Sequence, residues 1–156
     1  MVHNWSIAVA IGVFLACATS SPLSETRVSK DHFDISDIDT AKAAVRLFVR
    51  VIRERKERSV VFILPADAPS EVRHAIEEVA PIVQINQKAP GERIVYAYLQ
   101  DFVVSSRQGH IWVDLNTDSR INPKCLRGGG LGIEFSRVDD NVTLGTYTET
   151  AYLPLC

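Results

Sequence analysis

The residues whose types and spacing could do chemistry lie on one predicted strand. His110, Trp112 and Asp114 alternate along it, and side chains two positions apart in a strand point to the same face of the sheet. A tyrosine from the preceding strand, Tyr96 or Tyr98, could complete a cup between the sheet and a helix. A carboxylate held beside aromatic rings and away from water can act as a general base. The pattern therefore offers Asp114, with Tyr96 or Tyr98, as candidate catalytic residues.

The same alternation has a second interpretation that involves no catalysis. Polar and aromatic residues commonly alternate with apolar ones on a strand that is half buried. Trp112 would then cover a patch of solvent-facing sheet, while Ile111, Val113 and Leu115 face the core. We favour this interpretation, because such alternation is ordinary on strands.

A metal site is not predicted. His74, Glu77 and Glu78 share the spacing that can place two ligands on one face of a helix. There is no second histidine within reach and no zincin-type motif, so ordinary polar pairs on a surface helix explain the pattern better. We expect no metal and no cofactor.

Two further patterns are weaker candidates for a functional site. Asp31, His32 and Asp34 combine acidic groups with a histidine, but they lie at the edge of a flexible segment, which cannot hold a site in place. The glycines of residues 127–132 precede a predicted strand, whereas a phosphate-binding loop needs a following helix and a Lys-Ser or Lys-Thr pair. These glycines are therefore expected to permit a turn or a bulge.

Arg46, Arg50 and Arg53 form a basic stripe on the first predicted helix. A solvated helix face is the usual meaning of such a run. The alternative is contact with anionic lipid headgroups or envelope polymers. The whole chain has a formal net charge of −2, so no global basic field argues for nucleic acid as a partner.

The N-terminus is predicted to be an export signal. Residues 7–18 form an apolar stretch, shorter than the roughly 20 residues that a membrane-spanning helix needs. Ala16 and Ala18 are small residues at the positions that a signal peptidase reads, so residues 1–18 would be removed. Two alternatives remain: a lipoprotein whose Cys17 is acylated, and a cytosolic protein in which this segment is buried. The absence of Lys and Arg before the stretch is atypical of a signal peptide.

Export would leave Cys125 and Cys156 as an even pair in an oxidising compartment. They lie 31 positions apart, and a disulfide that closes a loop of this size stabilises a fold by roughly 3–4 kcal/mol in the chain-entropy model. No His or carboxylate cluster accompanies both thiols, so a disulfide is expected rather than a metal site.

The first predicted element is a helix. Apolar residues recur at helical spacing over residues 40–58, and Asp39 or Thr40 can cap the start. The preceding residues 19–32 are polar and are expected to form a flexible spacer. The domain would therefore comprise residues 33–156.

The remaining elements are mostly strands. A buried strand over residues 59–64 is followed by a second helix, which Asp67 or Ser70 opens and Pro81 ends. Five closely spaced strands are predicted after it, over residues 82–86, 93–104, 110–115, 131–138 and 142–153. This predicts an α+β domain in which an antiparallel meander packs against the first helix. In its order of elements it resembles the cystatin-like and NTF2-like folds, in which a curved sheet wraps a helix.

These features predict a small exported binding or accessory domain of the cell envelope or the extracellular space, without catalytic activity. No nucleophile, base and orienting group converge in the sequence. The partner is an unspecified envelope or extracellular molecule, and membrane contact follows only if Cys17 is lipidated. The alternative is an NTF2-like pocket enzyme that uses Asp114 with Tyr96 or Tyr98.

Overall fold

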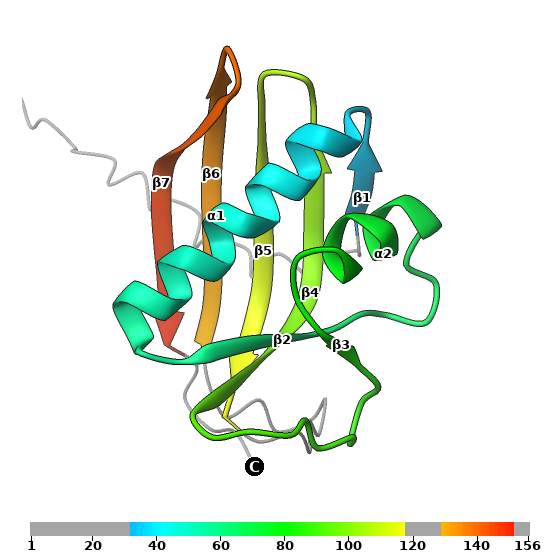
Figure 1. Cartoon of the computed structure of the whole chain (residues 1–156), viewed down its shortest axis with the longest axis vertical. Coiled ribbons are helices and arrows are strands. Elements are labelled where there is room, and N and C mark those ends of the chain that lie inside the picture. Colours follow the sequence, from blue (N-terminus) through cyan, green and yellow to red (C-terminus); the bar gives the residue numbers. More distant parts are fainter. Residues whose placement is uncertain (1–31, 118–128, 152–156) are drawn as a thin grey trace, which may run out of the picture.

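Two helices cover one face of a seven-stranded sheet (Figure 1). This computed structural model describes residues 32–117 and 129–151. The predicted signal peptide, most of the spacer and all three cysteines lie outside the described residues. No helix within the described ranges has the length and apolar character that crossing a membrane requires.

Helix α1 (Ile38–Lys56) begins earlier than predicted. The carboxylate of Asp37 accepts a hydrogen bond from the Thr40 backbone N–H at 2.8 Å, which satisfies one of the free donors at a helix N-terminus. The prediction of Asp39 or Thr40 as the cap is therefore wrong, and both residues belong to the first turn. The helix ends at Glu57, whose backbone adopts the left-handed conformation with φ of 51°.

The hydrophobic core lies between the helices and the sheet. Phe48 of α1 packs against Phe62 of the sheet, with ring centroids 5.6 Å apart. Both side chains are fully buried, and rings at such a distance attract each other beyond their simple burial. The largest fully buried side chains are Phe48, Phe62, Phe102, Ile52, Ile63, Ile76, Leu99, Ile111, Leu131 and Ile133.

Four strands form the antiparallel meander that the sequence predicts. They are β4 (Ile94–Val104), β5 (Gln108–Asn116), β6 (Gly129–Val138) and β7 (Asn141–Ala151), and each pairs antiparallel with the next. Helix α1 crosses diagonally over this part of the sheet (Figure 1). The meander and its packing on the first helix are confirmed.

The rest of the sheet is parallel, so the sheet is mixed and the predicted antiparallel meander forms only part of it. Strand β2 (Ser59–Ile63) pairs parallel with β4 and with the two-residue strand β3 (Ile82–Val83). The long connection from β2 to β4 contains α2 (Ser70–Glu77) and returns the chain to the same end of the sheet, as parallel neighbours require. Strand β3 is thus shorter than the strand predicted over residues 82–86.

A strand also occupies part of the predicted spacer. Strand β1 (His32–Ile35) pairs parallel with the second half of β4. It lies on the same side of β4 as β2, which pairs with the first half. The backbone groups of β1 find partners there, so regular structure includes His32, one residue before the predicted start of the domain at Phe33. Asp34 accordingly lies on a strand and is exposed.

Candidate functional site

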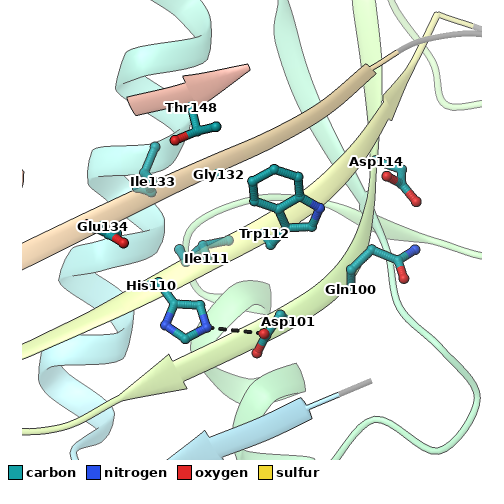
Figure 2. A pocket seen from close by; sticks show the side chains of 10 residues that line it. All are labelled: Gln100, Asp101, His110, Ile111, Trp112, Asp114, Gly132, Ile133, Glu134 and Thr148. Atoms are coloured by element: carbon teal, nitrogen blue, oxygen red, sulfur yellow. Dashed lines mark ion pairs between the residues drawn. The ribbon is translucent and has the colours of Figure 1, made fainter. Parts of the chain in front are cut away.

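The face of the sheet opposite the helices, called here the outer face, carries a hollow of about 550 Å³ (Figure 2). Ile111, Val113 and Leu115 of β5 belong to the core on the helix side, so alternation directs the intervening side chains outward. The hollow spans β4, β5, β6 and β7. It is lined by Gln100, Asp101, His110, Ile111, Trp112, Asp114, Gly132, Ile133, Glu134 and Thr148.

A bulge in β4 supplies two of the polar side chains. Leu99 pairs with Val113 and Asp101 pairs with Trp112, which leaves Gln100 as an extra residue. A bulge redirects side chains that strict alternation would send to opposite faces. Both Gln100 and Asp101 consequently line the hollow.

The centre of the hollow is the indole of Trp112, which lies on Gly132 of β6. The two residues are direct cross-strand partners, and a Cβ atom at Gly132 would lie only 2.2 Å from Cε3 of the ring. The glycine is therefore what allows the ring to lie against the strand. Figure 2 views this side of the sheet and shows the other face of the ring turned outward, away from β6.

Ionisable groups also line the hollow. His110 Nε2 lies 3.1 Å from Asp101 Oδ2, and Glu134 is the cross-strand neighbour of His110 on β6. Asp114 is 9% exposed, while Glu134 is exposed. Among the described residues that line the hollow there are three carboxylates, one histidine and no Lys or Arg.

The predicted cup between sheet and helix is wrong in its position. Core side chains fill the helix side of the sheet, whereas Trp112 and Asp114 lie on the outer face. Burying the apolar side chains of β5 stabilises the fold more than burying its polar side chains would. The apolar residues Ile111, Val113 and Leu115 therefore face α1. The favoured alternative, in which Trp112 covers a patch of sheet, agrees with its position over Gly132.

The two candidate tyrosines, Tyr96 and Tyr98, have different surroundings in the structure. The hydroxyl of Tyr96 accepts a hydrogen bond from the Ala89 backbone N–H at 3.0 Å, within a small buried cluster that also contains Val61 and Ile63. Tyr98 is instead the direct cross-strand neighbour of Asp114. Of the predicted set, therefore, only Tyr98 and Asp114 are paired across the strands.

The other predicted residues lie elsewhere. Arg46, Arg50 and Arg53 are exposed along α1. On α2, His74 Nε2 lies 3.1 Å from Glu78 Oε1, which is the ordinary polar pair predicted for this helix. No group of three or more potential metal-ligating side chains occurs within residues 32–117 and 129–151.

A cluster at the C-terminal end of α1 has no counterpart in the sequence analysis. Lys56 forms an ion pair with Glu149 of β7, and Glu149 also accepts a hydrogen bond from the Tyr147 hydroxyl at 2.9 Å. The Arg55 guanidinium lies 4.0 Å from the centre of the Tyr147 ring. Burial, followed by the bond to Glu149, raises the pKa of Tyr147 to about 12. The hydrogen bond from Lys56 is the main reason that the pKa of Glu149 is lowered. The cluster ties the helix to the edge strand.

Sequence reasoning missed Gln100, Asp101, Glu134 and Thr148 as members of the hollow. Their inclusion depends on the bulge in β4 and on strand register, and neither can be read from a single sequence. The one available signal was the glycine at position 132, since a glycine inside a strand often marks a close approach.

No family model, curated protein or solved structure matches this chain. The geometry of the hollow is therefore the basis on which its function is inferred.

Proposed function

We propose that the protein is a small exported binding or accessory domain of the cell envelope or the extracellular space, and that it binds its ligand in the outer hollow without a catalytic role. The observation that carries this proposal is the outward face of Trp112, supported by Gly132 and surrounded by polar side chains. Ligand sites combine apolar or aromatic surface with a few polar groups that fix orientation.

The fold is consistent with binding on this side. A helix lying across a curved sheet resembles the cystatin-like and NTF2-like arrangement, in which the concave side of the sheet faces the helix. Here that side is filled by buried side chains such as Phe48 and Phe102. The outer face carries the hollow beside Trp112, and a second hollow of about 540 Å³ lies beside Lys56 and Glu149 at the end of α1.

Export is supported by the apolar residues 7–18 and by the even cysteine pair that remains after cleavage. Mass spectrometry of the protein from its native host tests this part. We expect a chain that begins at Thr19 and contains a Cys125–Cys156 disulfide, or, for a lipoprotein, an acylated Cys17 at the N-terminus. An intact Met1 with two alkylatable thiols would refute export.

Binding is tested with the chain that begins at Thr19, in which Trp112 is the sole tryptophan; a Trp5→Phe variant gives the same single fluorophore where the N-terminus is retained. Its emission and the amide signal of Gly132 are followed while choline, agmatine, glucose, N-acetylglucosamine, acetate and phosphate are added in turn. We expect at least one compound to change both signals in a saturable way. If none does, the hollow is not a small-ligand site.

Catalysis by Asp114 with Tyr98 is the second candidate, because the strand register places these two residues opposite each other. Tyr96 contributes less to this candidate, since its hydroxyl is bonded to the Ala89 backbone. Each compound that binds is examined by proton NMR before and after a day with the protein. Conversion that is lost in Asp114→Asn would replace the binding role with a catalytic one.

The basic stripe of Arg46, Arg50 and Arg53 offers a second contact surface, for anionic headgroups or polymers. Within the described residues none of the three forms an ion pair. Co-sedimentation with phosphatidylglycerol vesicles tests it: replacing all three by Gln abolishes binding if the stripe is the contact. Binding that survives the triple substitution refutes this surface.

A further inference from the structure

Strand β7 forms one edge of the sheet (Figure 1). It is 11 residues long, and β6 is its one strand partner within the described residues. Alternate residues of an edge strand direct their backbone N–H and C=O groups away from the sheet, where another strand can pair with them. Many proteins protect such an edge by keeping it short or by placing Lys or Pro on it. Strand β7 is long and contains no Lys and no Pro.

A bulge divides β7 into two regular halves. Leu144 and Tyr147 pair with residues of β6 that are two positions apart, so Gly145 and Thr146 together lie opposite a single residue. Positions two apart in a strand direct their backbone groups the same way. Leu144 and Tyr147 therefore present equivalent backbone groups to the open edge, and both side chains are partly buried on the helix side. This equivalence lets the two halves of β7 pair with each other in a second, antiparallel copy.

The two ends of β7 lie beside opposite charges. The hairpin turn before the strand contains Asp139 and Asp140, which are both exposed, and only Asp140 has an ion-pair partner within the described residues, Arg137 at 3.5 Å. At the other end, Arg58 lines the hollow beside the last residues of β7, and Arg53 is exposed in the last turn of α1. Figure 1 shows the hairpin turn and this end of α1 at opposite ends of β7. Antiparallel pairing of two copies brings the acidic turn of each toward the basic helix end of the other.

We propose that two copies of this chain pair antiparallel along β7 and form one continuous sheet. Leu144 then lies opposite Tyr147 of the second copy, and the same register places Thr143 opposite Thr148 of the second copy. Aliphatic–aromatic pairs and pairs of threonines both stabilise neighbouring strands. Glu149 is the one charged residue of β7, and it lies opposite an uncharged residue, so no like charges face each other.

The contact is expected to be weak. Pairing along the whole strand forms about ten backbone hydrogen bonds, which is typical of an interface. One strand from each copy buries less than the roughly 1,200 Å² that a stable interface needs. We therefore expect a dissociation constant on the order of 10 μM. The dimer does not depend on the proposed ligand site, so either can fail without the other.

An extended segment of another protein is the competing occupant of this edge, because a peptide can also add a strand to a sheet. The observations favour a second copy. A peptide of arbitrary sequence would gain only the backbone hydrogen bonds. A second copy would also gain two pairs of Leu144 with Tyr147 and the two contacts between acidic turn and basic helix end.

Sedimentation velocity tests the pairing, on protein from its native host at concentrations from about 1 to 500 μM. We expect the mass to rise from that of a monomer to that of a dimer and to stop there, because a two-fold contact uses the edge of both copies. A protein that stays monomeric over this range would overturn the proposal and leave the edge to another chain. Growth beyond a dimer would also overturn it.

Charge substitutions at positions 143 and 148 test the register. Both threonines are exposed, so the fold is expected to persist, which urea unfolding checks. Combining Thr143→Lys with Thr148→Lys places like charges opposite each other twice and should weaken the dimer by at least about 5-fold. Combining Thr143→Glu with Thr148→Glu should do the same. An equimolar mixture of the two variants should associate again, because each new lysine then faces a glutamate. A mixture that associates no better than its separate components would overturn the proposal.

The control places the same charge elsewhere. Gln87 and Gln108 are exposed and lie outside β7, so combining Gln87→Lys with Gln108→Lys should change the dissociation constant by less than about 2-fold. If this variant weakens the dimer as much as the two lysines on β7 do, net charge rather than the β7 edge governs association, and the proposal is overturned.

Discussion

Substituting Gly132 by alanine tests the close contact on which the site depends. The added Cβ would lie 2.2 Å from Cε3 and 2.5 Å from Cζ3 of Trp112. Carbon atoms normally approach to about 3.5 Å, so the ring must move by roughly 1.3 Å or rotate off the strand. Gly132 is buried, and the backbone fixes the direction of the new Cβ, so the indole ring is what has to give way.

The expected cost follows from two opposing effects. Overpacking costs typically about 1–3 kcal/mol, while alanine in place of a strand glycine recovers up to about 1 kcal/mol of backbone entropy. Trp112 is partly exposed and can swing outward, which limits the strain. We therefore expect Gly132→Ala to lower the free energy of unfolding by about 1 kcal/mol and to shift the emission of Trp112 to longer wavelength.

Urea unfolding and fluorescence of the Trp5→Phe background measure both effects. Gly145→Ala on β7 is the matched control, because its new Cβ would come no closer than 3.3 Å to another atom. A double-mutant cycle with Trp112→Ala assigns the cause: once the ring is absent, Gly132→Ala should cost nothing. If Gly132→Ala leaves stability and emission unchanged, or costs as much without the ring as with it, the contact between ring and glycine is not what shapes the hollow.

Three further predictions concern the fold. Phe48→Ala removes a fully buried ring and should lower the free energy of unfolding by about 3–5 kcal/mol; a loss below about 1 kcal/mol in urea unfolding would mean that this core is not packed as described. Asp37→Ala removes the α1 cap and should cost about 0.5–2 kcal/mol at neutral pH. Because the hydrogen bond from the Thr40 backbone lowers the pKa of Asp37, its contribution should disappear as the pH falls through that lowered value, so that wild type and variant converge in acid; a gap that stays constant with pH would contradict this. Tyr147, with a pKa raised to about 12, should make the folded state lose stability between pH 10 and 12, where only the unfolded chain has lost this proton. Ultraviolet titration of Tyr147→Phe against wild type checks this, and an unchanged titration above pH 11 would refute the raised pKa.

Local patterns were sufficient to predict most elements. The 3.6-residue period of α1 and the apolar–polar alternation of β5 are properties of short segments, and a short segment is enough to determine which of its faces is apolar. The position of Asp114 and Trp112 on one face, opposite Val113, followed directly from this alternation. Element ends moved by one or two residues where a cap, such as Asp37, took precedence over its neighbours.

The arrangement of these elements required the tertiary structure. Parallel pairing of β1 and β2 with β4 joins segments far apart in the chain. No local sequence pattern determines which neighbour a strand will pair with. The bulge at Gln100 and the register that brings Glu134 to His110 are set by the pairing of whole strands. Lys56 and Glu149 are 93 positions apart, so their ion pair exists only once α1 lies across β7.

The amino-acid sequence by itself determined the α+β class, the meander and the shared face of His110, Trp112 and Asp114, because these depend on periodicities within single segments. Only the tertiary structure decided that this face lies away from the helices, that the sheet is mixed, and that a glycine on β6 supports the ring of Trp112. The physical reason is that the elements adopt the arrangement in which the burial of apolar surface, summed over the whole chain, is most favourable. That total, rather than any local pattern, determines which surface remains open to a ligand.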